Sequence, residues 1–251
     1  MNKKVGCIIE ARTNSKRLPN KVLLPVLNKP ILYWLIKRIK KIKKIKQIVL
    51  ATTINKNDDI LVKFAKKNKI KFFRGSESNV VGRVCGAAEK FKIKTIVEIT
   101  GDCPVIDINI INQLLDIFEK NSTEYVNNCN YRSYPDGMDV QIFNAKSLKK
   151  TLRNARDAKE LEHVGLHLIR NPQKFKTINV IAPKINYFPS LGLTLDEKKD
   201  YILLKKIIEH FGIKNPYFTC EEIIDLLNKK KKWKKINNKV KRIGSNIYKN
   251  R

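Results

Sequence analysis

A loop rich in cationic side chains follows the first apolar run of the chain. Residues 5–9 are apolar, and Arg12, Arg17 and Lys21 come next, among small polar residues and interrupted by Pro19. Guanidinium and ammonium groups neutralise phosphate oxygens, so this loop could bind a phosphorylated ligand. It matches neither the phosphate-loop pattern G-x-x-x-x-G-K-[ST] nor the dinucleotide pattern G-x-G-x-x-G. Taken alone, these charges fit a solvated surface equally well.

An acidic residue stands at the end of another apolar run. The segment ITGDCP, residues 99–104, puts Asp102 directly after a predicted strand and before a proline-containing turn. Ligands of open α/β sheets bind beyond the carboxyl ends of the strands, so Asp102 and the cationic loop should face one site. A carboxylate can hold Mg²⁺, which bridges phosphates and takes few protein ligands. Together these groups predict a nucleoside triphosphate site, although Asp102 alone could equally cap the turn or the following helix.

Strand-like and helix-like segments alternate through the first 120 residues. Short β-branched runs predict strands at 3–9, 46–53, 70–74 and 94–100. Helical periodicity predicts helices at 28–42, 57–68, 79–91 and 107–121, with N-caps at Asn28, Asn57 and Asp107 and with Pro30 in the first turn. This alternation predicts a mostly parallel sheet covered by helices on both faces.

The pattern is looser after residue 120. Strands are predicted at 124–130, 134–143 and 176–183, and helices at 157–171, 196–212 and 219–230. Pro135–Asp136–Gly137 predicts a turn, Gly212 a helix end, and Thr219 with Glu222 a capping box. We expect a single domain over 1–228, with a nucleotide-binding half at 1–120, an acceptor and dimerisation half at 121–228, and a basic tail at 229–251.

Composition restricts the class of protein. The chain has 251 residues, 42% hydrophobic and 30% charged, enough for one sizeable domain. No apolar run approaches the roughly 20 residues of a membrane-spanning helix, and five scattered cysteines without C-x-x-C spacing favour a reducing cytoplasm. A net charge of +30 could favour binding to nucleic acid or to an anionic membrane. Because lysine is spread over nearly every predicted helix, without interleaved aromatic residues, we expect neither partner.

The chain resembles the CMP-sugar cytidylyltransferases of the CMP-Kdo and acylneuraminate type. The resemblance rests on the opening pattern A-R-x-x-S-x-R-L-P-x-K together with G-D-C-P. It continues through YPDGMDVQIF, LEHV and LTLDEKKDY, and it covers nearly the whole chain. A closer likeness is to the branch known as spore coat polysaccharide biosynthesis protein F.

This resemblance implies a nucleotide-diphospho-sugar transferase fold, a Rossmann-like three-layer α/β/α sandwich with a mixed, mostly parallel sheet. It implies transfer of CMP from CTP to a sugar, in particular an acidic sugar for a surface polysaccharide or glycan, with release of pyrophosphate. Mg²⁺ as cofactor, a homodimer and a cytoplasmic location are implied with it. A glycosyltransferase of the same fold and, in a different class, a basic nucleic-acid-binding protein are the alternatives.

The resemblance also assigns roles to single residues. It implies catalytic roles for Arg17, Lys21 and Asp102, and metal ligation by Asp102 and Asp196. Nucleotide binding is implied for Ala11, Arg12, Ser15, Arg17, Lys21, Arg74, Gly75, Glu77 and Thr100. Acceptor binding is implied for Asp136, Asp139, His163 and Asp200.

Some of these residues have plainer interpretations. Ser15 could be ordinary loop, and Asp136 and Asp139 could serve only the turn. His163 and His167 are spaced i, i+4 on one predicted helix, but zinc would need a third ligand that the sequence does not offer. Within the loop, Arg17 precedes Leu18–Pro19 and should be held in place, whereas Lys21 should be a mobile point charge.

Several positions depart from the pattern of the resembled family. Glu10, Asn20, Gly82, Glu98 and Gly192 stand where other residues are common. A carboxylate at Glu10 is unfavourable beside a triphosphate unless it reaches a second metal or turns away. Asn20 is the residue best able to replace glycine in a left-handed conformation. From these departures we expect that the triphosphate-binding residues of the family are retained, whereas the contacts to the acceptor are altered.

Overall fold

A seven-stranded sheet forms the centre of the computed structural model, which describes residues 4–155, 157–212 and 214–242. The strand order is β5 (Lys71–Gly75), β4 (Gln47–Thr53), β1 (Val5–Glu10), β6 (Thr95–Thr100), β8 (Gln141–Asn144), β7 (Tyr125–Asn127) and β9 (Thr177–Asn179). Neighbouring strands pair in parallel except on either side of β8, where the pairing is antiparallel. The predicted mixed, mostly parallel sheet is therefore confirmed.

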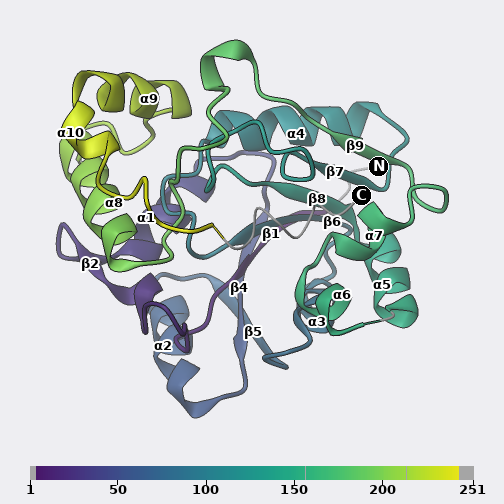
Figure 1. Ribbon diagram of the computed structural model, residues 1–251. Coiled ribbons are helices and arrows are strands. Elements are labelled where there is room, and N and C mark those ends of the chain that lie inside the picture. Colours follow the sequence, from purple (N-terminus) through teal and green to yellow (C-terminus); the bar gives the residue numbers. More distant parts are fainter. Residues whose placement is uncertain (1–3, 156, 213, 243–251) are drawn as a thin grey trace.

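Helices cover both faces of this sheet, as Figure 1 shows for α4 on one side and α3, α5 and α6 on the other. Alternation along β1 gives the reason, because Cys7 and Ile9 belong to one buried cluster and Ile8 to a second. The first cluster packs under α1 (Ile31–Ile39), α2 (Asp59–Lys67) and α4 (Ile108–Lys120). The second packs under α3 (Val80–Lys90), α5 (Ala145–Asn154), α6 (Ala158–Glu162) and α7 (Leu166–Arg170). The predicted three-layer α/β/α arrangement is confirmed.

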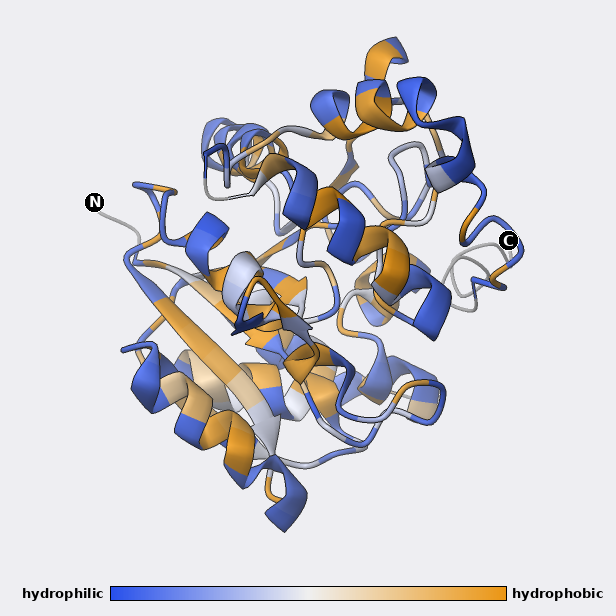
Figure 2. Cartoon of the chain, turned by 90° about the vertical axis from the view of Figure 1, so that its left-hand side faces the viewer, coloured by the Kyte–Doolittle hydropathy of each residue, from blue (hydrophilic) through white to orange (hydrophobic). Residues whose placement is uncertain are grey.

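The C-terminal helices form a group at one end of the molecule, beside α1 and β2 (Figure 1). They are α8 (Lys198–Phe211), α9 (Cys220–Lys229) and α10 (Lys231–Lys234). Apolar side chains of α8 and α9 join the first cluster, and Trp233 of α10 packs against it. Figure 2 shows hydrophilic residues along nearly every helix. The described lysines are exposed or half-buried, so most of them lie on solvent-facing surface. Within the described residues, no helix is both long and apolar enough to cross a membrane.

Short elements lie between the main layers. The strands β2 (Pro25–Val26) and β3 (Lys29–Pro30) form a separate two-stranded hairpin. The 3-10 helices are η1 (Lys21–Leu23), η2 (Lys56–Asp58) and η3 (Lys184–Asn186). The first of these begins directly after Asn20, which has a φ of 56° and so adopts the predicted left-handed conformation.

Three helix starts or spans differ from the sequence prediction. Asn28 does not cap α1, because it lies in the hairpin turn with a φ of 58° and the helix begins after Pro30. Asn57 does not cap α2 either, since it is inside η2 and Asp58 precedes the helix. The helix predicted over 157–171 is broken into α6 and α7. The Asp107 cap, the Gly212 end and the capping box of α9 are confirmed.

A buried arginine joins α1 to the C-terminal helices. Arg38 is 1% exposed, its Nε donates to the Ile106 carbonyl at 2.7 Å, and its Nη1 donates to the Pro216 carbonyl at 2.6 Å. Nη2 donates to the carbonyl of Phe218, whose ring lies 4.3 Å from the guanidinium carbon. A single side chain thus satisfies three backbone carbonyls from two distant parts of the chain.

We expect Arg38→Met to lower the free energy of unfolding by about 3 kcal/mol, because the variant leaves three buried carbonyl groups without the hydrogen-bond donors that the guanidinium now supplies. Urea denaturation followed by circular dichroism would measure this loss. Lys43→Met, at an exposed position shortly after α1, is the matched control and should change stability by less than about 0.5 kcal/mol. Equal stabilities of the two variants would contradict the anchoring role.

Candidate active site

The ammonium group of Lys21 joins two aspartates that are far apart in the sequence. Its Nζ lies 2.6 Å from Asp102 Oδ2 and 3.3 Å from Asp196 Oδ1. Asp102 follows β6, and the backbone N–H of Leu195 donates to the Asp102 carbonyl at 2.8 Å, which lays the segment before Asp196 against it. The structure therefore brings together the two predicted metal ligands and one predicted phosphate-binding cation.

The charges in this junction stabilise one another. Burial opposes ionisation of Asp102, but the ammonium of Lys21 outweighs it and lowers the pKa of that carboxyl. Burial likewise opposes the charge on Lys21, while Asp102 and Asp196 raise its pKa. The Lys21 side chain is only 13% exposed, so the prediction of a mobile point charge is wrong. The sequence could not indicate that two carboxylates would enclose it.

Arg17 lies on the outer side of the same junction. Its Nη2 is 2.9 Å from Asp196 Oδ1, and its Nη1 is 3.6 Å from Glu197 and donates to the Lys241 carbonyl at 3.2 Å. The side chain is 31% exposed, more than twice the value for Lys21. Arg17 is thus both held by several groups, as predicted, and accessible to a ligand.

Three other predicted nucleotide-binding residues form a second group near the ends of β4 and β5. They are Arg12, Arg74 and Glu77. Arg12 Nη1 lies 3.2 Å from Glu77 Oε1, and Glu77 Oε2 accepts from the side-chain amide of Asn55 at 2.7 Å. Arg74 turns towards the loop after β4 and pairs with Asp59 at 2.6 Å. Arg12 and Glu77 are close together, whereas the contacts of Arg74 brace the loop.

The four remaining nucleotide-binding predictions fall in or near these groups. Ala11 is buried, and its N–H donates to the Ala51 carbonyl at 3.2 Å. Gly75 ends β5, and the Thr100 hydroxyl hydrogen-bonds Asp102 and so helps to lower its pKa. Ser15 is half-buried, and its N–H donates to the carbonyl of Thr13 at 2.9 Å. No ligand contact tests these four residues, whose roles stay predictions.

A buried carboxylate that the sequence analysis did not single out fixes the start of the cationic loop. Asp58 Oδ1 accepts from both the N–H and the hydroxyl of Thr13 at 2.7 Å, and Asp58 Oδ2 accepts from the hydroxyl of Thr53 at 2.5 Å. Burial opposes its ionisation, but these hydrogen bonds lower the pKa of Asp58. The β1 and β4 loops are therefore tied together where they approach the site.

The predicted acceptor-binding aspartates lie around Arg132, another residue that the sequence analysis missed. Arg132 Nη1 is 3.2 Å from Asp136 Oδ1, and Nη2 is 3.1 Å from Asp139 Oδ2. Burial and the charge of Asp139 raise the pKa of Asp136 to about 7. Gly137 has a φ of 103°, and a Cβ there would lie 2.5 Å from the Leu193 carbonyl carbon, so the predicted turn packs against the strand-like segment that leads to Asp196.

The last two predicted acceptor residues have different surroundings. Asp200 is fully buried, and its Oδ2 accepts from the N–H groups of Asp196 and Glu197 at 3.1 and 2.8 Å. These contacts give it a structural task, and acceptor binding by Asp200 stays a prediction. His163 follows the last residue of α6 as its C-cap, and its N–H donates to the Lys159 carbonyl at 2.8 Å. Among the contacts of the described residues, none joins the His163 side chain to another predicted site residue.

The break after α6 also separates the two histidines. His167 belongs to α7, where its Nδ1 lies 2.8 Å from buried Glu160. This pairing gives His167 a structural role within the α6–α7 region. Among the described residues, no group of three or more His, Cys, Asp or Glu side chains could hold a metal ion by itself.

Glu10 and Glu98, two of the positions that depart from the family pattern, lie on the paired strands β1 and β6, where Glu98 is buried and Glu10 is half-buried. Burial and the charge of Glu10 raise the pKa of Glu98 well above its ordinary value, so that the pair of carboxyl groups holds a shared proton. Glu98 also accepts from the Gln141 amide at 2.7 Å, and the Gln141 carbonyl oxygen accepts from the Tyr125 hydroxyl at 2.5 Å. Burial raises the pKa of Glu10 to about 7, and the charge of Asp102 acts in the same direction. The unfavourable negative charge expected at Glu10 is thus reduced by protonation.

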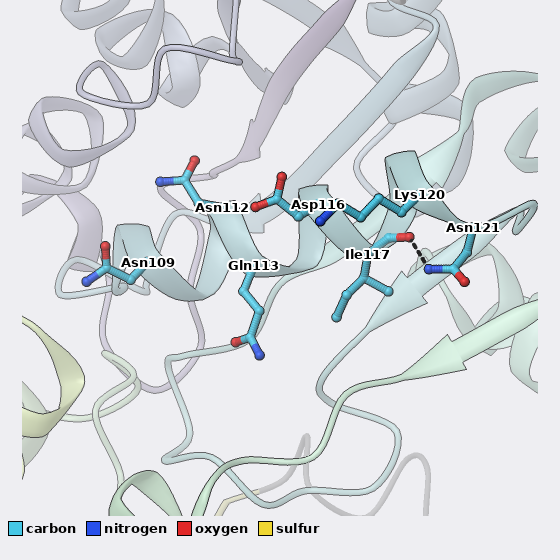
Figure 3. Close-up of a pocket in the computed structure, with 7 residues that line it drawn as sticks. All are labelled: Asn109, Asn112, Gln113, Asp116, Ile117, Lys120 and Asn121. Carbon is cyan, nitrogen blue, oxygen red and sulfur yellow. Dashed lines mark hydrogen bonds between the residues drawn. The ribbon is translucent and has the colours of Figure 1, made fainter.

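A pocket of about 440 Å³ lies along α4 and involves none of these groups. Figure 3 shows that it is lined by side chains of that helix and of Asn121, whose amide donates to the Ile117 carbonyl at 2.7 Å. These amides, Asp116 and Lys120 lie on one outer face of α4, and the pocket offers no cluster suited to phosphate chemistry.

Comparison with known proteins agrees with this geometry. The family model described as cytidylyltransferase matches residues 6–243. The spore coat polysaccharide biosynthesis protein SpsF of Bacillus subtilis is 31% identical over 227 residues, which are 88% of this chain and 93% of that one. A 3-deoxy-manno-octulosonate cytidylyltransferase of Lawsonia intracellularis is 25% identical over 202 residues, 73% and 78% of the two chains.

A solved cytidylyltransferase from Leptospira borgpetersenii superposes with a TM-score of 0.88 and 34% identity, over 95% of this chain and 99% of that one. The three-layer fold and the cationic loop that faces Asp102 and Asp196 define a nucleotidyltransferase. More specifically, the chain belongs to the cytidylyltransferase family.

We expect the carboxyl pair to make stability depend on pH. The folded pKa of Glu10, about 7, lies above the ordinary value of 4.5, so its stabilising contribution is present below about pH 4.5 and is lost as pH rises through 7. Relative to Glu10→Gln, the wild type should lose about 3 kcal/mol of unfolding free energy between pH 4.5 and 8.

Denaturation of both proteins across this pH range would measure the difference. Glu221→Gln, at an exposed position of α9, serves as the control, and it should follow the wild type. Parallel pH dependences of the wild type and Glu10→Gln would contradict the shared proton.

Proposed function

We propose that this enzyme transfers CMP from CTP to a hydroxyl group of a sugar and releases pyrophosphate. The observation that carries the proposal is the junction of Lys21 with Asp102 and Asp196, with Arg17 beside it. A triphosphate needs cations for its oxygens, and the two carboxylates at the same point suit a divalent cation that bridges phosphates.

The residues at the junction fit Mg²⁺. Asp102 and Asp196 supply hard oxygen donors, and a cationic nitrogen already lies within 3.3 Å of both carboxylates. Asp102 and Asp196 would hold the metal in the proposed complex. Bound Mg²⁺ would neutralise charge on the phosphates and polarise the α-phosphorus for attack.

The chain's own residues would then position and stabilise the reacting groups. Arg17 and Lys21 would neutralise the β- and γ-phosphate oxygens, and they assist the reaction to the extent that they bind the departing pyrophosphate more tightly in the transition state. The acceptor hydroxyl loses its proton to the surrounding water as its oxygen forms a bond to the α-phosphorus. The bond from that phosphorus to the pyrophosphate oxygen breaks, and its electron pair leaves with pyrophosphate. Holding the two substrates in line supplies much of the remaining rate enhancement.

The acceptor is proposed to be an acidic sugar destined for a surface polysaccharide or glycan. The support is the name of the Bacillus subtilis relative, a spore coat polysaccharide biosynthesis protein, and that of the octulosonate cytidylyltransferase. The homodimer and the cytoplasmic location that the resemblance implied stay predictions.

Pyrophosphate release measured with CTP, UTP, ATP and GTP, each against a panel of acidic and neutral sugars, tests this function. CTP together with an acidic sugar should give the highest kcat/KM. Release of pyrophosphate that requires another nucleotide, or no release with any pair, would contradict the proposal.

We expect Asp102→Asn and Asp196→Asn each to lower Mg²⁺-dependent turnover at least about 100-fold, because each removes one ligand charge from the site of transition-state stabilisation. Turnover should be measured over a range of Mg²⁺ concentrations, with thermal melting as the control for folding. Near wild-type turnover of both folded variants at saturating Mg²⁺ would show that the metal assignment is wrong.

Arg17→Lys should lose most of the activity although it retains the charge. The guanidinium presents a fork of donors that matches two phosphate oxygens, which an ammonium group cannot reproduce. Steady-state kinetics as a function of CTP concentration would measure a fall in kcat/KM of at least about tenfold. Lys16→Ala, at an exposed neighbouring position, is the control. Normal kinetics of folded Arg17→Lys would mean that Arg17 does not grip the triphosphate.

A further inference from the structure

The C-terminal segment 237–242 lies along both sides of the active site. On one side, its Lys241 carbonyl accepts from Nη1 of Arg17 at 3.2 Å. On the other, the amide of Asn237, which is 3% exposed, donates to Asp200 Oδ1 at 2.8 Å. The segment therefore connects the phosphate-binding loop with the buried carboxylate at the start of α8.

Arg242 enters the site from the end of this segment. Its Nη2 lies 2.6 Å from Asp200 Oδ1, its Nη1 lies 3.8 Å from Asp196 Oδ2, and its Nε lies 4.0 Å from Asp136 Oδ2. The side chain is 14% exposed. One guanidinium thus faces three carboxylates. They are Asp196, the proposed metal ligand; Asp136, on the proposed acceptor side; and buried Asp200, which accepts hydrogen bonds from the backbone of Asp196 and Glu197.

Gly192 makes room for this guanidinium. A Cβ at residue 192 would lie 1.9 Å from Nη2 of Arg242 and 2.4 Å from its Cζ, far inside van der Waals contact. The carbonyl of Gly192 also accepts from the Asn237 amide at 2.9 Å. The departure at position 192 is therefore matched to a side chain that comes from 50 residues later in the sequence.

We propose that Arg242 is a positioning residue of the active site, which sets Asp196 on the metal side and Asp136 on the acceptor side relative to each other. Three carboxylates at this spacing repel one another, and the shared cation offsets that repulsion while its fixed fork restricts their orientations. Since Asp136 and Asp196 belong to the two sides that must meet in the transfer step, their relative placement affects the in-line geometry of the two substrates. The inference rests on the proposed function.

The assignment predicts a specific kinetic pattern for Arg242→Ala. The kcat should fall at least about tenfold, while KM for CTP and KM for the acceptor each change less than about threefold, because positioning acts on the joint step. Arg242→Lys, which keeps the charge without the fork, should recover part of kcat. Lys239→Ala, at an exposed position of the same segment, should behave as the wild type.

A double-mutant cycle with Gly192→Ala separates positioning from other causes. The added Cβ must displace the guanidinium, so Gly192→Ala should lower kcat as Arg242→Ala does, and the double variant should be no worse than either single variant. CTP affinity measured by calorimetry should stay near the wild-type value in all three proteins, whereas the two variants that lack Arg242 should melt at a lower temperature because buried Asp200 loses its counter-charge.

Unchanged kcat in Arg242→Ala, or additive effects in the cycle, would overturn the inference. A parallel loss of kcat, CTP affinity and melting temperature would also overturn it, by showing a structural role alone. Arg242→Gln provides a second variant that keeps a donor to Asp200 if the alanine variant does not fold. Absence of wild-type turnover with every nucleotide and sugar would instead refute the proposed function, and this inference with it.

Discussion

The Lys21 ammonium between Asp102 and Asp196 is the interaction on which the arrangement of the site depends. Asp102 follows the central strand β6 in the first half of the chain, and Asp196 precedes α8 in the second half. A partly buried carboxylate is costly without a counter-charge, so these two groups can lie side by side only with a cation between them. The geometry that suits a triphosphate and a divalent metal is thus stabilised before either ligand binds.

The same constraint explains the surrounding network. Asp58 fixes the start of the loop that carries Lys21, and Asp200 fixes the backbone around Asp196. Each carboxylate is satisfied by N–H or O–H donors, which is how a buried charge is retained. Supporting groups therefore determine where the charged residues of the site lie, although they need not touch a substrate themselves.

Much of the fold could be predicted because its signals are local. The β-branched runs gave the central strands, and Asp107 and Thr219 marked helix starts correctly. The hairpin at 25–30 was missed because Asn28, one of its two left-handed residues, together with Pro30 has the sequence pattern of a helix start. The broken helix after Glu162 was missed because helical periodicity continues across it.

The candidate site could be predicted only where its residues form a pattern along the chain. The loop with Arg17 and Lys21 and the turn with Asp102 had such a pattern, whereas Arg132 and Arg242 did not. These two arginines join the site through packing between distant segments, and among 53 Lys and Arg residues nothing local distinguishes them. Gly192 indicated in the sequence that a side chain is absent at this point of the site. It could not indicate that Arg242 fills the space.

A crystal structure of the protein with CTP and Mg²⁺ would test the central claim most directly. The account predicts a metal ion bound by Asp102 and Asp196, with Lys21 moved from between them onto the phosphates and with Arg17 on the same triphosphate. A complex in which Lys21 still bridges the two aspartates, while the triphosphate and its metal lie elsewhere, would contradict it.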